Sequence, residues 1–92
     1  MKLIKTIVVT INKKPKEIPT NGCLVLLKNR SSAAEIFVKE YGENYEAASC
    51  TEDNGMIIES GEKVNIPLRI NKLSAIATED NVSLEITYLG EE

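Results

Sequence analysis

The residue types that carry most enzyme chemistry are scarce in this chain of 92 residues. It contains no histidine, which is the commonest general base and metal ligand. Its six serines and two cysteines could serve as nucleophiles, but a nucleophile needs a positioned base, and no motif places one beside them. The sequence therefore predicts a protein that is not an enzyme and has no catalytic residues.

Two pairs of adjacent acids are the next candidates for chemistry. Glu52 with Asp53, and Glu79 with Asp80, lie in predicted turns, where carboxylates usually bond to nearby backbone groups. An open turn also lacks the enclosed site that paired glycosidase carboxylates need. Together with Asn54, the first pair could offer oxygen ligands to a structural Ca²⁺, although the EF-hand spacing is absent. We expect no metal and no cofactor, with a calcium loop as the alternative.

Charge is unevenly distributed along the chain, although the formal net charge is only −3. Residues 1–30 carry seven basic side chains against one acid, a net of +6, whereas residues 31–92 carry four against thirteen, a net of −9. The acidic remainder would repel phosphate, and four aromatic residues without tryptophan leave little for base stacking, so we expect no nucleic-acid partner. The basic cluster is either a solvated turn or one edge that meets an acidic edge of a neighbouring copy.

The start of the chain does not have the pattern of a signal peptide. The longest apolar run, residues 23–27, is far short of the roughly 20 residues that cross a bilayer. We therefore expect a soluble protein, made in a cytoplasm, with no membrane partner. Because the cytosol keeps thiols reduced, Cys23 and Cys50 are expected to be two small buried side chains, with a disulfide or redox pair as the alternative.

Apolar residues alternate with polar ones along much of the chain, which is typical of half-buried β-strands. The clearest cases are residues 64–70 and residues 82–88. Residues 3–11 are β-branched on both faces, so we expect this strand to be covered on both sides, with a neighbouring subunit as a candidate cover. Further strands are expected at residues 23–28, in the centre of a sheet, and at residues 56–59 and 73–78.

Turn residues separate these segments at regular intervals. Asn-Gly pairs at residues 21–22 and 54–55 tolerate the positive φ angles that tight hairpins need. Pro67 donates no ladder hydrogen bond, which predicts that its strand lies at a sheet edge or carries a bulge.

One segment is ambiguous between helix and strand. Ser32 and Glu35 have the spacing of a capping box, so residues 32–42 could form a short helix, but the β-favouring run at residues 36–38 favours a strand. Residues 43–54 are expected to form a long connection. The whole pattern predicts one domain, residues 1–92, with an all-β fold. We expect a small antiparallel β-sandwich, jelly-roll or Ig-like, of about seven to nine short strands.

The order of the segments between Asn54 and Gly90 is more specific than any one of them. Asn-Gly is followed by Met-Ile-Ile, a Ser-Gly-Glu turn, an alternating strand, Asn-Lys-Leu-Ser-Ala-Ile and a last strand that contains Tyr88. Upstream lie the polar residues 28–32 and the run Ile-Phe-Val at residues 36–38. Over roughly residues 20–90 this layout resembles that of small β-sandwich virion proteins of tailed bacteriophages.

The resemblance implies a non-enzymatic virion structural protein, a capsid decoration or auxiliary head protein, located in the virion after synthesis in the host cytoplasm. Its expected partners are the major capsid protein or other virion proteins and copies of itself, with a trimer favoured. The alternative is a binding module of a tail or baseplate, for a host-surface glycan or a protein receptor. Contacts are expected at the first strand, the basic cluster and the strand of the proline: Ile4, Thr6, Val8, Lys13, Lys14, Lys16, Pro67 and Arg69.

Overall fold

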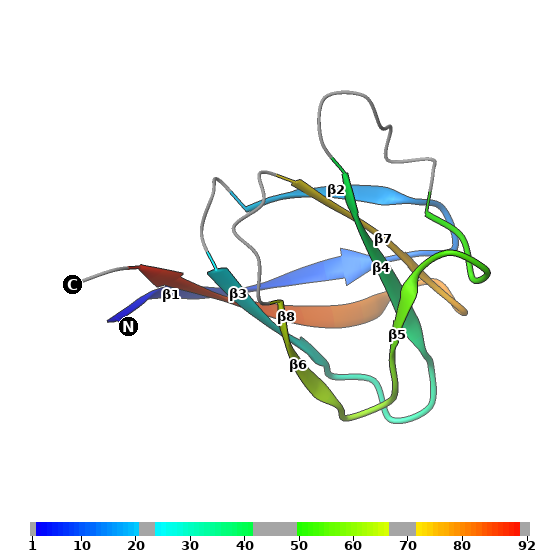
Figure 1. The fold of residues 1–92 in the computed structure, drawn as a ribbon. Helices are drawn as coiled ribbons and strands as arrows, with labels where there is room; N and C mark the ends of the chain where they lie inside the picture. Colours follow the sequence, from blue (N-terminus) through cyan, green and yellow to red (C-terminus); the bar gives the residue numbers. More distant parts are fainter. Residues whose placement is uncertain (1, 21–23, 42–49, 67–71, 91–92) are drawn as a thin grey trace.

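The computed structural model describes residues 2–20, 24–41, 50–66 and 72–90 of the chain. These residues form eight β-strands and no helix, so the described part offers no helix that could span a membrane (Figure 1). The strands are β1 (Lys2–Ile11), β2 (Lys16–Pro19), β3 (Leu24–Asn29), β4 (Ile36–Tyr41), β5 (Met56–Ile58), β6 (Lys63–Ile66), β7 (Lys72–Ala77) and β8 (Val82–Gly90).

The strands form two antiparallel four-stranded sheets. The first sheet has the order β1-β8-β3-β6 and the second has the order β2-β7-β4-β5. The first strand of the chain thus pairs with the last, the second with the seventh, the third with the sixth and the fourth with the fifth, which is the jelly-roll arrangement. The expected β-sandwich is confirmed, and the strand order selects the jelly roll over the Ig-like alternative. Both ends of the chain lie side by side, because Lys2 is opposite Gly90 (Figure 1).

The core lies between the two sheets and is built by alternate residues of each strand. On β8, Leu84 and Ile86 are fully buried, while Ser83 and Glu85 on the other face are half-buried. Full burial of one such aliphatic side chain stabilises the fold by about 1.5–3 kcal/mol. The core side chains of the remaining strands are Ile11, Ile18, Val25, Leu27, Ile36, Val38, Ile58, Ile66, Leu73, Ala75 and Ala77.

The ambiguous segment forms a strand, as the β-favouring run predicted. Residues 36–41 are β4, and the turn before it is held by Ser31, whose hydroxyl accepts hydrogen bonds from the N–H groups of Ala33 at 3.1 Å and Ala34 at 2.8 Å. The capping-box spacing from Ser32 therefore does not begin a helix. Residues 43–49 of the expected long connection lie outside the described residues.

Two other strands test predictions from the sequence. β3 lies between β8 and β6, which confirms the expected central strand. β6 lies at an edge of the first sheet, as the proline predicted, although Pro67 and residues 68–71 lie outside the described residues. β2 was not predicted, because its four residues contribute one buried side chain, Ile18, and alternation is not visible over so short a run.

The Asn-Gly pair at residues 54–55 suggested a positive φ angle there, but neither residue has one. Among the described residues, positive φ angles occur at Gly61, with φ of 75°, and Asn81, with φ of 62°. Gly55 is required for a close approach instead, because a Cβ there would lie 2.9 Å from the Cβ of Phe37 and 3.0 Å from the Thr51 carbonyl oxygen. Its lack of a side chain allows the chain to pass close over β4.

A buried amide joins several elements at one end of the sandwich. Asn29, at the end of β3, is fully buried, and its Nδ2 donates to the carbonyl oxygens of Ala34 at 2.8 Å and Ile58 at 3.0 Å. Its Oδ1 accepts from the N–H of Ser31 at 2.9 Å. The backbone of Asn29 also bonds to the turn between β5 and β6, at Gly61 and at Glu62. The side chain thus ties the first sheet to β5 of the second sheet.

Candidate functional site

The outer side of β1 forms the first part of the candidate site. β1 pairs with β8 over its whole length, and no strand in the described part of the chain pairs with its other side, which we call the β1 edge. Thr6, Val8 and Thr10 lie on the outer face of the first sheet and are exposed. Val8 is 50% exposed, the highest value among the large hydrophobic side chains of the described residues.

The two faces of β1 differ. Ile7 and Val9 pack against the core and Ile11 is fully buried, whereas the outer face is not covered by any described part of this chain. The expectation that β1 is covered on both sides is thus not met within the described chain, because the second sheet can cover only one face of the first. A covering subunit stays a prediction.

Two contacts fix the early part of β1 against β8. The hydroxyls of Thr6 and Thr87 lie 3.2 Å apart and share a hydrogen bond on the outer face. The ammonium of Lys5 lies 5.2 Å from the centre of the Tyr88 ring. The register shifts between Leu3 and Lys5, so Ile4 is the extra residue of a β-bulge, and its side chain lies outside the described residues.

Residues 12–16, which we call the basic turn, connect β1 to β2 and form the second part of the site. Asn12 holds the turn in place: its carbonyl accepts from the N–H of Ala77 at 2.8 Å, and its Oδ1 accepts from the N–H of Asn81 at 2.8 Å. The N–H of Lys13 donates to Oδ1 of Asp80 at 3.1 Å. The basic turn is therefore fastened to the turn between β7 and β8.

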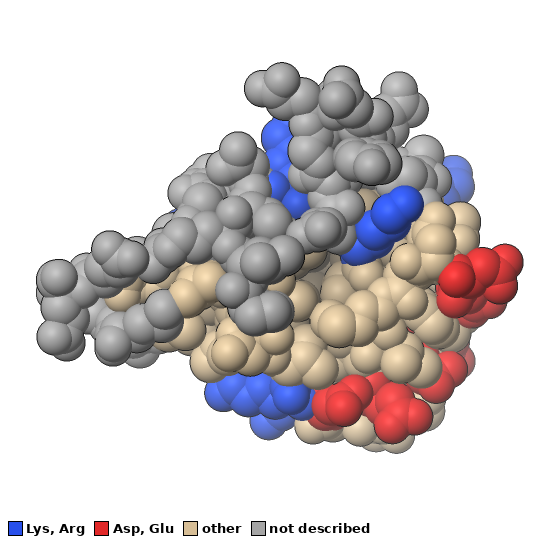
Figure 2. Space-filling view, in the orientation of Figure 1, with Lys and Arg blue, Asp and Glu red and all other residues tan. Residues whose placement is uncertain are grey.

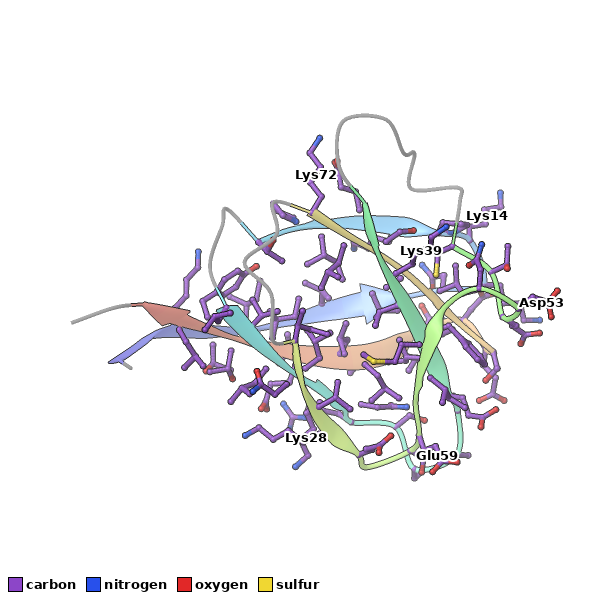
Figure 3. All side chains as sticks on the ribbon, viewed as in Figure 1. Lys14, Lys28, Lys39, Asp53, Glu59 and Lys72 are labelled. Carbon is purple, nitrogen blue, oxygen red and sulfur yellow. The ribbon has the colours of Figure 1, made fainter. Side chains whose placement is uncertain are left out.

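The three lysines of the cluster are exposed, but they differ in their contacts. The Lys16 ammonium donates to the Thr10 carbonyl of β1 at 3.2 Å, whereas Lys14 extends into solvent at the end of the molecule where Asp53 also lies (Figure 3). Asp80 on one side of the basic turn and Asp53 on the other place acidic side chains near its lysines. On the face in Figure 2, the basic and acidic side chains form small groups, and the basic group at the lower edge lies directly beside an acidic one.

Folding removes much of the charge asymmetry seen along the chain. Arg30, at the end of the basic first third, forms an ion pair with Glu85 of β8 at 3.8 Å. A second ion pair, at 3.1 Å, joins Lys72 of β7 to Glu17, the one acid of residues 1–30. Both pairs are largely exposed, and such pairs contribute about 0–1 kcal/mol. The chain therefore presents no broad basic surface in its described part.

Two open hollows flank the basic turn. One, of about 550 Å³, lies between the turn and residues 50–53; the other, of about 860 Å³, lies between the turn and residues 80–81. Both are lined by lysines and acids together, and neither is lined by an aromatic side chain. Among the described residues, no three His, Cys, Asp or Glu side chains come close enough to hold a metal ion.

The loop that could have bound calcium is held by its own hydrogen bonds. Oδ1 of Asn54 accepts from the N–H of Thr51 at 2.7 Å, and the Thr51 hydroxyl accepts from the N–H of Asp53 at 3.2 Å. These are local turn contacts of the kind expected of such residues.

Cys50 lies on the outer face of the second sheet and lines the smaller hollow. It is 2% exposed, its Sγ lies 3.5 Å from the Phe37 carbonyl oxygen, and it is a free thiol. Burial raises the pKa of the Cys50 thiol above its ordinary value, against the lowering effects of Ser74, Ile76 and Lys39. The expected buried role is confirmed for Cys50, while Cys23 lies outside the described residues.

The structure brings together most of the predicted contact residues. Thr6 and Val8 on β1, and Lys13, Lys14 and Lys16 beyond it, lie along one edge of the sandwich. Pro67 and Arg69 lie outside the described residues, and the strand before them, β6, is at the opposite edge of the first sheet. That strand is three ladder spacings, about 14 Å, from β1.

Sequence reasoning missed the exposed apolar residues at the other edge. Met56 and Ile57 of β5 are 44% and 40% exposed. The apolar run at residues 56–58 predicted a strand, but a three-residue run has no alternation that could indicate which side is buried. Asn29 was also missed, because one polar residue at the end of an apolar strand gives no sign that it will be buried.

No family model matches this chain, and comparisons with curated proteins and with solved structures give no significant match. The jelly-roll fold is found in viral capsid domains, lectin domains and cupins. A fold shared by such different proteins does not define a function. The function therefore has to be argued from the β1 edge and the basic turn.

Proposed function

We propose that this jelly-roll protein is a non-enzymatic structural protein of a tailed-bacteriophage virion, which binds the capsid surface as a decoration or auxiliary head protein and also binds its own copies. The observation that carries the proposal is the β1 edge, a long strand side that is uncharged from residue 6 to residue 11 and continues into the three lysines of the basic turn. One edge of the molecule thus offers backbone for strand pairing and charge for an acidic partner.

Repetition on a lattice suits a module of this kind. Each copy of a small domain makes weak contacts, and many simultaneous contacts give a high overall avidity. Exposed lysines beside a β-edge steer association with an acidic surface and tune its salt dependence rather than its affinity. The order of segments, which resembles that of small phage virion proteins, supports the same role.

The glycan-binding alternative gains no support from the aromatic residues. An accessible aromatic ring can stack on a sugar, but Tyr88 is 4% exposed, with its hydroxyl donating to the Pro19 carbonyl at 2.9 Å. The side chain of Tyr41 and the whole of Tyr45 lie outside the described residues. No second function is therefore proposed.

The test is whether the chain is part of purified virions. Virions of the phage that encodes the chain would be banded on a density gradient, dissociated into heads and tails, and analysed by quantitative mass spectrometry. We expect the chain in the DNA-filled head fraction, in many copies per virion. Its absence from virions, or its presence in the tail fraction alone, would contradict the proposal. A variant with Lys13, Lys14 and Lys16 replaced by Glu should show weaker head binding at low salt.

A further inference from the structure

The four edge strands of the sandwich differ in how they are protected against pairing. β2 and β6 have four residues each and carry lysine, with proline at the end of β2, while β5 has only three residues. Short length, charge and proline are the usual ways in which proteins prevent edge-to-edge association. β1 has ten residues, and its second half, residues 6–11, contains no charge and no proline.

We propose that the β1 edge pairs with β1 of a second copy, antiparallel about a twofold axis that passes through Val8. This inference deepens the proposed function, on which it rests for its biological setting, by identifying where copies meet. The first sheets of the two copies then form one continuous sheet of eight strands. Val8, the most exposed large hydrophobic side chain described, contacts Val8 of the partner subunit on the outer face.

The direction of the backbone groups supports this register. The Thr10 carbonyl accepts from Lys16 of β2, which indicates that it points to the β1 edge rather than toward β8. In an antiparallel strand the N–H and C=O of one residue point to the same side, and the side alternates along the chain. Thr6, Val8 and Thr10 therefore present their backbone groups to the β1 edge. With the twofold axis at Val8, Val8 forms a hydrogen-bonded pair with Val8 of the partner subunit, and Thr6 forms one with Thr10 of the partner subunit. The Thr10 carbonyl oxygen has two lone pairs, so it can accept from both the partner subunit and Lys16.

The side chains that meet in this register are compatible. Val8 lies opposite Val8 of the partner subunit, and Thr6 lies opposite Thr10 of the partner subunit. Cross-strand pairs of apolar side chains and of threonine side chains both stabilise sheets. Lys5 faces Ile11 of the partner subunit, so no like charges are opposite one another between residues 5 and 11. On the outer face of the first sheet, the neighbour of Val8 on β8 is Glu85, which lies one strand away from the twofold axis.

A twofold edge pair gives a dimer and not the trimer that the resemblance favours. Each β1 edge is used once, so association through it stops at two copies and closes. Further lattice contacts would then use other surfaces, such as the basic turn. The trimer prediction and the pairing proposal can therefore be separated by mass.

The first measurement is the mass of the full chain by light scattering over a range of concentrations. We expect twice the 10.2 kDa of one chain at high concentration. Val8→Lys should raise the dissociation constant of the dimer about a hundredfold, because like charges at the centre of an interface disfavour association strongly. The matched control is Ile57→Lys on β5, since Ile57 is also an exposed edge residue, at 40%. It should leave the dissociation constant unchanged.

Cross-linking then tests the register. In a hydrogen-bonded antiparallel pair the Cα atoms are about 5.5 Å apart, which a disulfide can span. Val8→Cys should form a disulfide-linked dimer under mild oxidation, whereas Ser83→Cys, on the outer face of β8, should not. The unmodified chain, with its two natural cysteines, shows any background. A circular dichroism spectrum for each variant establishes that it is folded.

The outcomes are distinct. A dimer that is lost in Val8→Lys, kept in Ile57→Lys and linked by Val8→Cys supports the proposal. A monomer at millimolar concentration, a trimer, or a dimer that Ile57→Lys disrupts and Val8→Lys does not would overturn it. Because virion binding is measured separately, a chain that is found in heads but never pairs through β1 refutes the pairing alone. A chain that pairs but is absent from virions refutes the proposed function alone.

Discussion

The two edges of this sandwich stand in contrast. At one edge, β5 and β6 are short, and the buried amide of Asn29 fastens β5 and the turn that follows it to β3. At the other edge, β1 is long and uncharged over its second half, and its outer face is not covered by any described residue. At the first edge, hydrogen bonds of Asn29 join the two sheets and short strands limit pairing, whereas at the second edge a long strand has no described strand on its outer side. Stability therefore depends more on the first edge and association more on the second.

The largest expected effect is at the first edge. Asn29→Leu removes the partners of the Ala34 and Ile58 carbonyls and of the Ser31 N–H, which leaves buried polar groups unpaired. We expect the free energy of unfolding to fall by about 3–4 kcal/mol, because each unpaired buried group costs about 1–3 kcal/mol. Chemical denaturation measures the change. Asn65→Leu, at an exposed asparagine of β6, is the matched control and should change stability little. Equal effects would show that the buried amide does not stabilise this edge.

The second prediction concerns the glycine that precedes β5. Gly55→Ala would place a Cβ 2.9 Å from the Cβ of Phe37, so the chain has to shift away from β4. We expect a loss of about 1–3 kcal/mol, which is the usual cost of overpacking. Gly61→Ala is the comparison, since a Cβ there meets nothing within 4 Å and the cost of about 1 kcal/mol comes from its positive φ alone. If Gly61→Ala proved the more harmful of the two in thermal unfolding, the close approach at Gly55 would be wrong.

A smaller effect is expected at the second edge. Asn12→Ala removes the acceptor for the Asn81 N–H and loosens the basic turn from the turn between β7 and β8. We expect a loss of about 1 kcal/mol, the net value of a typical hydrogen bond. Lys14→Ala, at an exposed neighbour, should stay within about 0.5 kcal/mol of the unmodified chain. A larger effect of Lys14 than of Asn12 on the urea midpoint would contradict this description of the turn.

The smallest expected effect is a pH dependence of the free energy of unfolding, which comes from Cys50 on the outer face of the second sheet. Burial raises the pKa of the Cys50 thiol in the folded chain, so the unfolded chain loses this proton first as the pH rises. The free energy of unfolding is therefore unaffected below the ordinary thiol pKa and falls as the pH rises above it. Denaturation of the unmodified chain and of Cys50→Ala between about pH 7 and pH 10 gives the difference in slope. Parallel curves for the unmodified chain and Cys50→Ala would rule out the effect.

Much of the fold could be predicted from the sequence, but the pairing of its strands could not. Alternation at residues 82–88 and the β-branched run at residues 3–11 correctly predicted β8 and β1, because the period of two is a local property. Which strands lie side by side depends on residues far apart in the chain, such as Thr6 and Thr87, and no local pattern records it. The sequence therefore named contact residues on the first strand and on the strand of Pro67 without indicating that β1 and β6 lie at opposite edges of the first sheet.

The candidate site could likewise be predicted only in part, because some of its residues show a local pattern and others do not. Lys13, Lys14 and Lys16 were found from their spacing, and their exposure agrees with that reading. Asp80, whose carboxylate accepts from the N–H of Lys13, comes from another part of the chain, so the sequence did not indicate that this acid lies beside the lysines. Asn29 was not singled out as a structural residue, and Gly55 was expected only as a turn residue, since burial and close approach are properties of the folded chain.

Amide hydrogen exchange on β1, measured at low and at high protein concentration, tests the central claim most directly. In the dilute chain, we expect the N–H groups of Ile7 and Val9, which face β8, to exchange slowly, and those of Thr6, Val8 and Thr10 to exchange fast. At high concentration the second set should become protected, because the β1 edge is then paired. Protection of Thr6, Val8 and Thr10 that does not change with concentration, or no protection of them at any concentration, would contradict the account.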